Sequence, residues 1–217
     1  MYMIKLKDIL LEDDRLNILK PRRTKAERIK NHQIAIQRKI QQYIKNGSKG
    51  DLNLEDTPVE SLPSNLTKVD GNLYLENTLI QTLPDNLVVS GELNLSDTKI
   101  QSFPNNLTVG GELDLSNTKI LTLPNNLSLT GGLNLFGTKI KELPDNLTVG
   151  GSLNLNLSKI QKIPTNLIVK GNLFLDSTPL AKKYMLKQRE FKRLLPGVKG
   201  KIYFDHDEYI NKVDPYA

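Results

Sequence analysis

One 20-residue unit repeats through the middle of this chain. Segments of the form Gly-x-Leu-x-Leu recur seven times, the first two 21 residues apart and the rest 20 residues apart. They begin at Gly50, Gly71, Gly91, Gly111, Gly131, Gly151 and Gly171. Fixed self-similarity at this period is typical of a solenoid, in which one unit cannot bury its leucines alone and packs on its neighbours. We therefore predict that residues 50–180 form a stack of about seven coils.

Each unit predicts a strand followed by a turn. Apolar and polar positions alternate through residues 107–115, which is the period of a β-strand. The proline of a Leu-Pro-x-Asn-Leu block, as in residues 83–87, restricts the backbone, and the Asn tolerates a left-handed conformation. Twenty residues with both features leave no room for a helix on the return side. The expected fold is a repeat solenoid, mainly β, with a parallel sheet on one side and short 3₁₀ or polyproline-like segments on the other.

Two polar columns accompany the leucines. A Thr or Ser follows each strand, at Thr57, Thr78, Thr98, Thr118, Thr138, Ser158 and Thr178, and an Asn recurs in the Leu-Pro-x-Asn-Leu blocks. Stacked from coil to coil, such side chains can form hydrogen-bond ladders. We interpret both columns as structural rather than catalytic.

These residues carry a family resemblance. The spacing Leu-x-Leu-x-x-Thr-x-Ile-x-x-Leu-Pro, present in residues 93–104 with Phe103 in place of the last Leu, resembles the leucine-rich repeat. It is most similar to the short 20-residue bacterial class, whose units also carry Leu-Pro-x-x-Leu. The lysine-rich segment at residues 4–10 resembles the opening of repeat proteins from tailed bacteriophages. The likeness covers about 130 of the 217 residues and implies a leucine-rich-repeat-like solenoid.

The chain departs from that family in two respects. The family usually has Asn where this chain has Thr, so the ladder must be made by hydroxyl groups or moved to the Asn of the Leu-Pro-x-Asn-Leu block. Some bacterial members also carry a cysteine-dependent ubiquitin ligase domain. Because this chain has no Cys, that activity does not transfer.

Segments on either side of the repeats are expected to cap the solenoid. Residues 24–46 predict a helix that begins after the capping residue Thr24 and ends at Asn46-Gly47. Its apolar stripe is expected to pack on the first coil and consists of Ile29, Ile36, Ile40, Tyr43 and Ile44. Residues 179–195 predict a second helix, with Leu180, Tyr184, Phe191 and Leu194 at helical spacing, and residues 198–204 predict a short strand or a tight hairpin. The predicted organisation is a basic segment at 1–49, the solenoid at 50–180, and a C-terminal cap and tail at 181–217.

The net charge of +6 is unevenly distributed. Residues 1–50 carry 13 Lys and Arg against 5 Asp and Glu, residues 51–180 carry 8 against 14, and residues 181–217 carry 9 against 5. An acidic middle between two basic ends indicates that the ends and the middle differ in the charge of the partners they can bind. The longest apolar runs are too short for a transmembrane helix, and no signal peptide is expected. We expect no membrane partner and a location in the cytoplasm or a virus particle.

The N-terminal helix is also a candidate contact surface. Its basic residues are Lys25, Arg28, Lys30, Arg38 and Lys39, and Arg22 and Arg23 directly precede it. A solvated cap is the preferred interpretation; an acidic protein partner and the phosphate backbone of a nucleic acid are the alternatives.

The outward side chains of the strands form the most regular surface. Most are small and polar, so the aromatic Phe136, Tyr74 and Phe174 are the candidate contacts with a protein partner, together with Asn134, Asp114 and Glu76. Tyr74 and Phe174 can alternatively cover the faces near the caps. A lysine column, Lys99, Lys119, Lys139 and Lys159, is interpreted as solubilising, with a basic ridge for a partner as the alternative.

The sequence predicts no catalytic, metal or cofactor site. No Ser/His/Asp arrangement, phosphate-binding loop or His cluster is present. Nothing directs the side chains of residues 205–208 toward one metal ion. Glu112 and Asp114, on one strand, are expected to point to opposite faces and so form no acid/base pair. We therefore expect a non-enzymatic protein–protein interaction module; the alternatives are a structural component of a virus particle that docks through its basic ends, and a nucleic-acid-binding protein.

Overall fold

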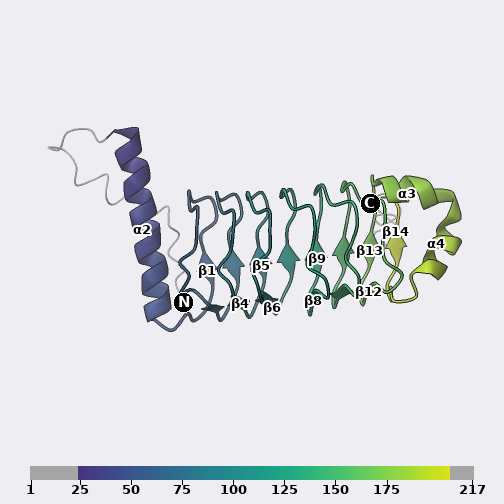
Figure 1. The fold of residues 1–217 in the computed structure, drawn as a ribbon, viewed down its shortest axis with the longest axis horizontal. Coiled ribbons are helices and arrows are strands. Elements are labelled where there is room, and N and C mark those ends of the chain that lie inside the picture. Colours follow the sequence, from purple (N-terminus) through teal and green to yellow (C-terminus); the bar gives the residue numbers. More distant parts are fainter. Residues whose placement is uncertain (1–23, 206–217) are drawn as a thin grey trace, which may run out of the picture.

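The coils stack in a single row between two helical caps. A computed structural model describes residues 24–205, apart from the side chain of Lys25. Helix α2 (Lys25–Lys45) crosses one end of the row, and α3 (Pro179–Tyr184), the 3₁₀ turn η1 (Met185–Lys187) and α4 (Gln188–Leu194) close the other (Figure 1). The predicted β-solenoid with two caps is confirmed.

One parallel sheet runs the length of the row. Its order is β1-β3-β5-β7-β9-β11-β13-β14. The bounds are Leu52–Asn53, Leu73–Tyr74, Leu93–Asn94, Leu113–Asp114, Leu133–Asn134, Leu153–Asn154, Leu173–Phe174 and Ile202–Tyr203. Equivalent repeat positions pair from coil to coil, as Leu113 does with Leu133. A residue's column in the repeat is therefore also its column in space.

Two shorter sheets follow the lower edge of the coils in Figure 1. One contains β2 (Lys68–Val69), β4 (Val88–Val89) and β6 (Thr108–Val109), and the other β8 (Ser128–Leu129), β10 (Thr148–Val149) and β12 (Ile168–Val169). Between β6 and β8 the hydroxyl group of Thr130 donates to the carbonyl oxygen of Gly110 at 2.6 Å. The return side of the described coils contains turns and extended segments without helix, as the sequence predicted.

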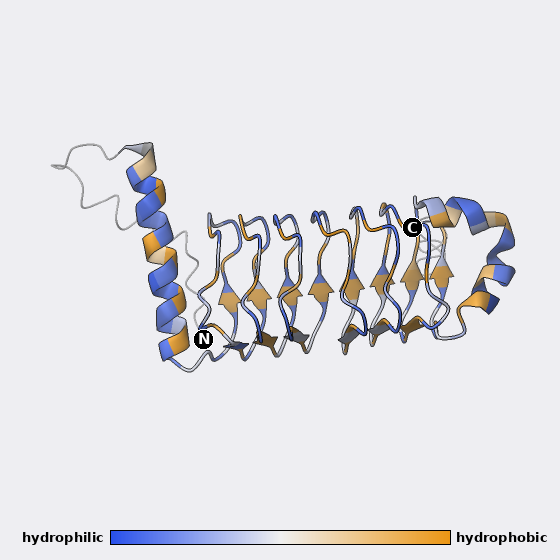
Figure 2. Ribbon diagram, in the orientation of Figure 1, coloured by the Kyte–Doolittle hydropathy of each residue, from blue (hydrophilic) through white to orange (hydrophobic). Residues whose placement is uncertain are grey.

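Leucine, isoleucine and valine columns fill the interior. Both leucines of every Gly-x-Leu-x-Leu segment are buried. Figure 2 shows the hydrophobic residues of the main sheet in orange along the whole row. The glycine that opens the segment permits close stacking. A Cβ atom on Gly131 would overlap with the main chain of Gly111 in the preceding coil. The glycine column is thus a consequence of the distance between coils.

The two polar columns have different roles. Each buried Thr donates its hydroxyl proton within its own coil, to the carbonyl oxygen three residues earlier, as Thr118 does to Leu115 at 2.6 Å. The expected Thr ladder is therefore not formed. The Asn column does form ladder contacts, such as Asn146 Nδ2 to Asn126 Oδ1 at 3.1 Å, and both residues have the left-handed backbone conformation.

Helix α2 starts and stops where the sequence predicted. The Thr24 hydroxyl accepts from the Glu27 main-chain N–H at 3.2 Å, and the Glu27 carboxylate accepts from the Thr24 N–H at 2.8 Å, which completes a capping box. Ile36 and Ile40 are buried on the first coil, but Ile29 is 43% exposed. The apolar contacts of the helix with the solenoid lie in its C-terminal half, Gln33 Nε2 also donates to Glu60 Oε1 at 3.0 Å, and the first turns extend beyond the coils (Figure 1).

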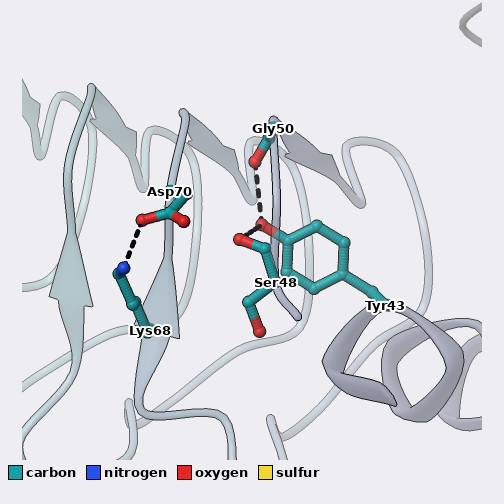
Figure 3. Close-up of polar contacts among 5 residues, drawn as sticks. All are labelled: Tyr43, Ser48, Gly50, Lys68 and Asp70. Carbon is teal, nitrogen blue, oxygen red and sulfur yellow. Dashed lines mark hydrogen bonds and ion pairs between the residues drawn. The ribbon is translucent and has the colours of Figure 1, made fainter. Parts of the chain in front are cut away.

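The junction between α2 and the first coil is polar as well as apolar. The Tyr43 hydroxyl group lies 2.9 Å from the carbonyl oxygen of Ser48 and 2.8 Å from that of Gly50, beside the Lys68–Asp70 ion pair (Figure 3). Burial is the main cause that raises the pKa of Tyr43 to about 12, and nearby carboxylates add to it. The neutral phenol therefore holds the helix to the chain that leads into β1.

The C-terminal cap differs from the single helix expected for residues 179–195. The chain forms α3, η1 and α4 in succession. Because of this bend the Phe191 ring packs against Tyr184, with centroids 4.7 Å apart, and edge-on against Phe204 at 5.5 Å. Leu195 is buried in place of Leu194, which is 43% exposed. The predicted strand within 198–204 is confirmed as β14, which pairs with β13.

Candidate functional site

The outward face of the main sheet is the candidate site, and its central column has a structural role. In five coils the Asn or Asp between the two leucines accepts a hydrogen bond from the main-chain N–H two residues later, at 2.7–3.1 Å. These residues are Asn53, Asn94, Asp114, Asn134 and Asn154. The side chains shape the turn that ends each strand. Two of the predicted contact residues, Asn134 and Asp114, therefore also stabilise the fold of their coils.

The aromatic residues that break this column lie near the two caps. Asn72 Nδ2 donates to the Tyr74 hydroxyl group at 2.9 Å in the second coil. The Phe174 ring stacks on Tyr203 of β14, with centroids 5.2 Å apart and planes 10° from parallel. Phe174 thus contributes to the C-terminal cap, which was the alternative interpretation of this residue. Tyr74 and Phe174 both remain partly exposed.

Phe136 is different because it lies in the middle of the array. Its column holds Ser96, Ser116 and Asn156 in the neighbouring coils. The main-chain N–H of Phe136 donates to Asn134 Oδ1 at 3.1 Å, so the backbone follows the same turn as its neighbours. The side chain is half-buried and lies outside the continuous core. An aromatic ring has replaced a small polar side chain here without a change in the coil.

Carboxylates gather on the same face in the first four coils. Burial raises the pKa of Glu92, and the Glu112 and Asp114 carboxylates raise it further; burial and Asp114 raise the pKa of Glu112. Glu112 and Asp114 therefore lie on one face, close enough for the Asp114 carboxylate to act on Glu112. The expectation that they point to opposite faces is wrong, because residues two apart in a strand share a face. Glu76 is exposed and accepts from Asn94 Nδ2 at 3.3 Å.

The N-terminal basic residues have different environments. Arg28, Lys30 and Arg38 are exposed, whereas Lys39 is half-buried and donates from Nζ to the carbonyl oxygen of Asn53 at 2.9 Å. Burial lowers the pKa of Lys39. Arg22 and Arg23, and the side chain of Lys25, lie outside what the structure describes.

One exposed apolar residue next to this face was not predicted from the sequence. Leu157 is 48% exposed and occupies the column that follows Phe136 and its equivalents. The other members of that column are Asp56, Asn77, Asp97, Asn117, Gly137 and Ser177. An apolar residue in a column of small and polar ones was the signal that could have identified it.

Comparisons with known proteins leave the site to be interpreted from its own geometry. No protein-family model matches the chain, and no curated protein is significantly similar to it. Among residues 24–205, no helix has the length and apolar character needed to cross a bilayer. Within the same residues, no three His, Cys, Asp or Glu side chains are grouped so that they could hold a metal ion.

Proposed function

We propose that this chain is a leucine-rich-repeat protein that binds another protein through the outward face of its main sheet, without catalysing a reaction. The 20-residue Leu-x-Leu unit, the parallel sheet and the non-helical return side support the family assignment. A rigid solenoid presents side chains at fixed spacing, which suits recognition of an extended surface.

Phe136 is the observation that carries this proposal. Large aromatic side chains are enriched among the residues that dominate binding energy at protein interfaces. Phe136 stands on a face whose equivalent positions are polar, in a coil whose backbone does not require it. Tyr74, Asn134, Asp114 and Glu76 are the proposed surrounding contacts. Phe174 is a weaker candidate because Tyr203 covers part of its ring.

The test replaces two of the aromatic residues, Phe136 and Tyr74, by the residue that neighbouring coils carry. Phe136→Ser and Tyr74→Asn proteins are used to capture partners from the source cell, with identification by mass spectrometry. We expect the partner bound by the wild-type protein to be lost, while circular dichroism and the melting temperature stay unchanged. The control is Leu121→Gln, because Leu121 is 60% exposed on a different edge of the coil. Equal capture of the partner by the wild-type and Phe136→Ser proteins would contradict the assignment of the outward sheet face as the binding surface.

The exposed basic side chains of α2 support a second candidate, binding to nucleic acid or to an acidic protein. Arg28, Lys30 and Arg38 are exposed on this helix, and none has an ion-pair partner among residues 24–205. Contacts with phosphates predict affinity for a DNA duplex that falls steeply between about 50 and 200 mM salt. Replacement of the three residues by Glu should abolish it. A flat salt response, or equal binding by the triple variant, argues against nucleic acid.

We also propose a bacteriophage origin and a place in the virus particle or the host cytoplasm, on the resemblance of the repeats and of the lysine-rich opening. Detection of the protein at stoichiometric level in purified particles would support a structural role. Its absence from them would remove that role and leave the binding module.

A further inference from the structure

Each coil leaves the sheet through one residue in the left-handed conformation. The φ angles of this column lie between +54° and +69° at Asp56, Asn77, Asp97, Asn117, Gly137, Leu157 and Ser177. Gly, Asn and Asp tolerate this region, whereas a bulky side chain brings its Cβ atom too close to the following carbonyl oxygen. Leu157, at +58°, is therefore strained.

Packing does not explain the choice of leucine at this position. The Leu157 side chain is 48% exposed and belongs neither to the core nor to the partly buried residues that pack against it. Its backbone makes the same contact as the rest of the column, since its N–H donates to the carbonyl oxygen of Asp176 at 2.9 Å. Asn or Gly would satisfy that geometry at lower conformational cost. A strained and exposed apolar residue is a mark of a functional surface.

Leu157 lies beside the other apolar replacement in the array. The main-chain N–H of Gly137 donates to the carbonyl oxygen of Asn156 at 3.0 Å, so the Phe136–Gly137 turn and the Asn156–Leu157 turn are neighbours. Coils stacked through such bonds are about 4.8 Å apart. Two adjacent coils thus carry a large apolar side chain at the same corner, where the preceding coil carries Ser116 and Asn117.

The side chains beside this corner carry a net positive charge, because two lysines outweigh Asp176, whose main chain bonds to Asn156 and Leu157. Lys139 and Lys159 follow Gly137 and Leu157 by two residues, both are exposed, and neither has an ion-pair partner within residues 24–205. Residues 51–130 carry 3 Lys and 11 Asp or Glu, whereas residues 131–180 carry 5 Lys and 3 Asp or Glu. The sign of the charge along the solenoid therefore changes at the coil that contains Phe136.

We propose that Phe136, Leu157, Lys139 and Lys159 form a docking corner for an acidic segment of another protein, which places an aliphatic or aromatic side chain against the two apolar residues and its carboxylates against the two lysines. This inference rests on the proposed function and specifies its partner. Burial of the apolar pair provides the affinity, and the lysines select an acidic sequence.

The experiment selects ligands with a random peptide library displayed on a carrier, using the full chain as bait. The pool is depleted on a Phe136→Ser/Leu157→Asn protein, so that only ligands of the corner remain. We expect the surviving peptides to share Asp or Glu around one large apolar residue. A synthetic peptide of that consensus should bind the Leu157→Asn protein, and separately the Lys139→Glu/Lys159→Glu protein, at least tenfold more weakly than wild type. Leu121→Gln, a change at another exposed leucine, should leave its affinity unchanged.

A second measurement separates a docking role from a structural one. Leu157→Asn removes the strain, so its melting temperature should rise by about 2–4 °C, the shift expected for a small stabilisation in a chain of this size. Binding and stability should therefore change in opposite directions. A lower melting temperature for Leu157→Asn would overturn the inference, because leucine would then serve the fold.

The selection also distinguishes failure of this inference from failure of the proposed function. Peptides that require Phe136 but not Leu157, or that are basic, overturn the docking corner and leave binding through the sheet face intact. Peptides that bind the Phe136→Ser and Tyr74→Asn proteins as tightly as they bind the wild-type protein overturn both the docking corner and the proposed function. Self-association of the wild-type protein that Leu157→Asn abolishes would identify a second copy as the occupant and overturn the acidic segment.

Discussion

Lys39 of α2 donates a hydrogen bond from its ammonium group to the main-chain carbonyl oxygen of Asn53, 2.9 Å away on β1. In every later coil the equivalent carbonyl group accepts from the main-chain N–H of the preceding coil, as Tyr74 does from Leu54 at 2.9 Å. β1 has no preceding coil, so a side chain of the cap supplies the donor. Open strand edges promote association with other chains, and Lys39 reduces that tendency at this edge.

Replacement of Lys39 by Met should therefore destabilise the protein by about 1 kcal/mol, because the carbonyl group loses its partner while the aliphatic part of the side chain keeps its packing. Urea denaturation followed by circular dichroism measures the change. Lys45→Met is the control, since Lys45 is exposed in the last turn of the same helix. Equal stability of the two variants would contradict this role of Lys39.

Tyr43 predicts a loss of stability in alkaline solution. The pKa of this phenol is raised to about 12, above the value of about 10 in an unfolded chain. The stability that the neutral phenol provides is therefore complete below pH about 10 and is lost as the pH rises toward about 12. Tyr43→Phe should cost about 1 kcal/mol at neutral pH and should flatten the alkaline part of the stability curve.

The matched control for Tyr43 is Tyr184→Phe in the C-terminal cap. The Tyr184 ring packs against Phe191, and its hydroxyl group makes no hydrogen bond among residues 24–205. Urea denaturation at a series of pH values from neutral to alkaline compares the two variants with the wild-type protein. An alkaline loss as large in Tyr43→Phe as in the wild-type protein would show that another group is responsible.

The spacing between coils predicts that alanine lowers stability by different amounts at two adjacent glycines. A Cβ atom on Gly131 would overlap with the main chain of Gly111, so Gly131→Ala must push two coils apart, at a typical cost of about 1–3 kcal/mol. A Cβ atom on Gly132 would lie 3.2 Å from its nearest neighbour, the carbonyl oxygen of Ser152. That contact is tight but is relieved by a shift of a few tenths of an ångström, so Gly132→Ala should cost clearly less stability than Gly131→Ala. Similar melting temperatures for the two variants would contradict this account of the spacing between coils.

The repeat made most of this fold predictable, because Leu, Gly and Asn columns each have a single physical reason that the sequence displays. The break at η1 was not predictable from spacing. Tyr184 and Phe191 are seven residues apart, as on one continuous helix, but their contacts with each other and with Phe204 decide the path of the chain. Local periodicity carries no information about a cluster that includes a later strand.

The candidate site was predicted less completely than the fold. Phe136 was evident as an aromatic residue in a polar column, but Leu157 lies in a column whose left-handed conformation becomes visible only in the structure. Asn134 and Asp114 stabilise their coils by accepting hydrogen bonds from the main-chain N–H groups two residues later. The sequence of the column that contains them does not reveal these bonds.

Glu92 and Glu112 predict an increase in stability on mild acidification. Burial raises the pKa of both groups, and the charges of Glu112 and Asp114 raise that of Glu92 further. Just above the ordinary glutamate pKa of about 4.3, the folded protein binds protons that the unfolded chain does not. The contribution of these two groups to stability therefore rises as the pH falls from neutral toward that value, opposite to a carboxylate held in an ion pair.

A Glu92→Gln/Glu112→Gln protein should consequently be more stable than the wild-type protein at neutral pH, and its advantage should shrink as the pH falls through the raised pKa values. Added salt should also reduce the advantage, because the repulsion among these partly exposed carboxylates is screened. Denaturation at a series of pH values measures the difference, and carbon NMR of the carboxyl groups measures the two pKa values directly. Asp114→Asn is the matched variant: it keeps both glutamates and removes a named cause, so both pKa values should fall. A stability difference that stays constant with pH would contradict the raised pKa values of Glu92 and Glu112 in the folded protein.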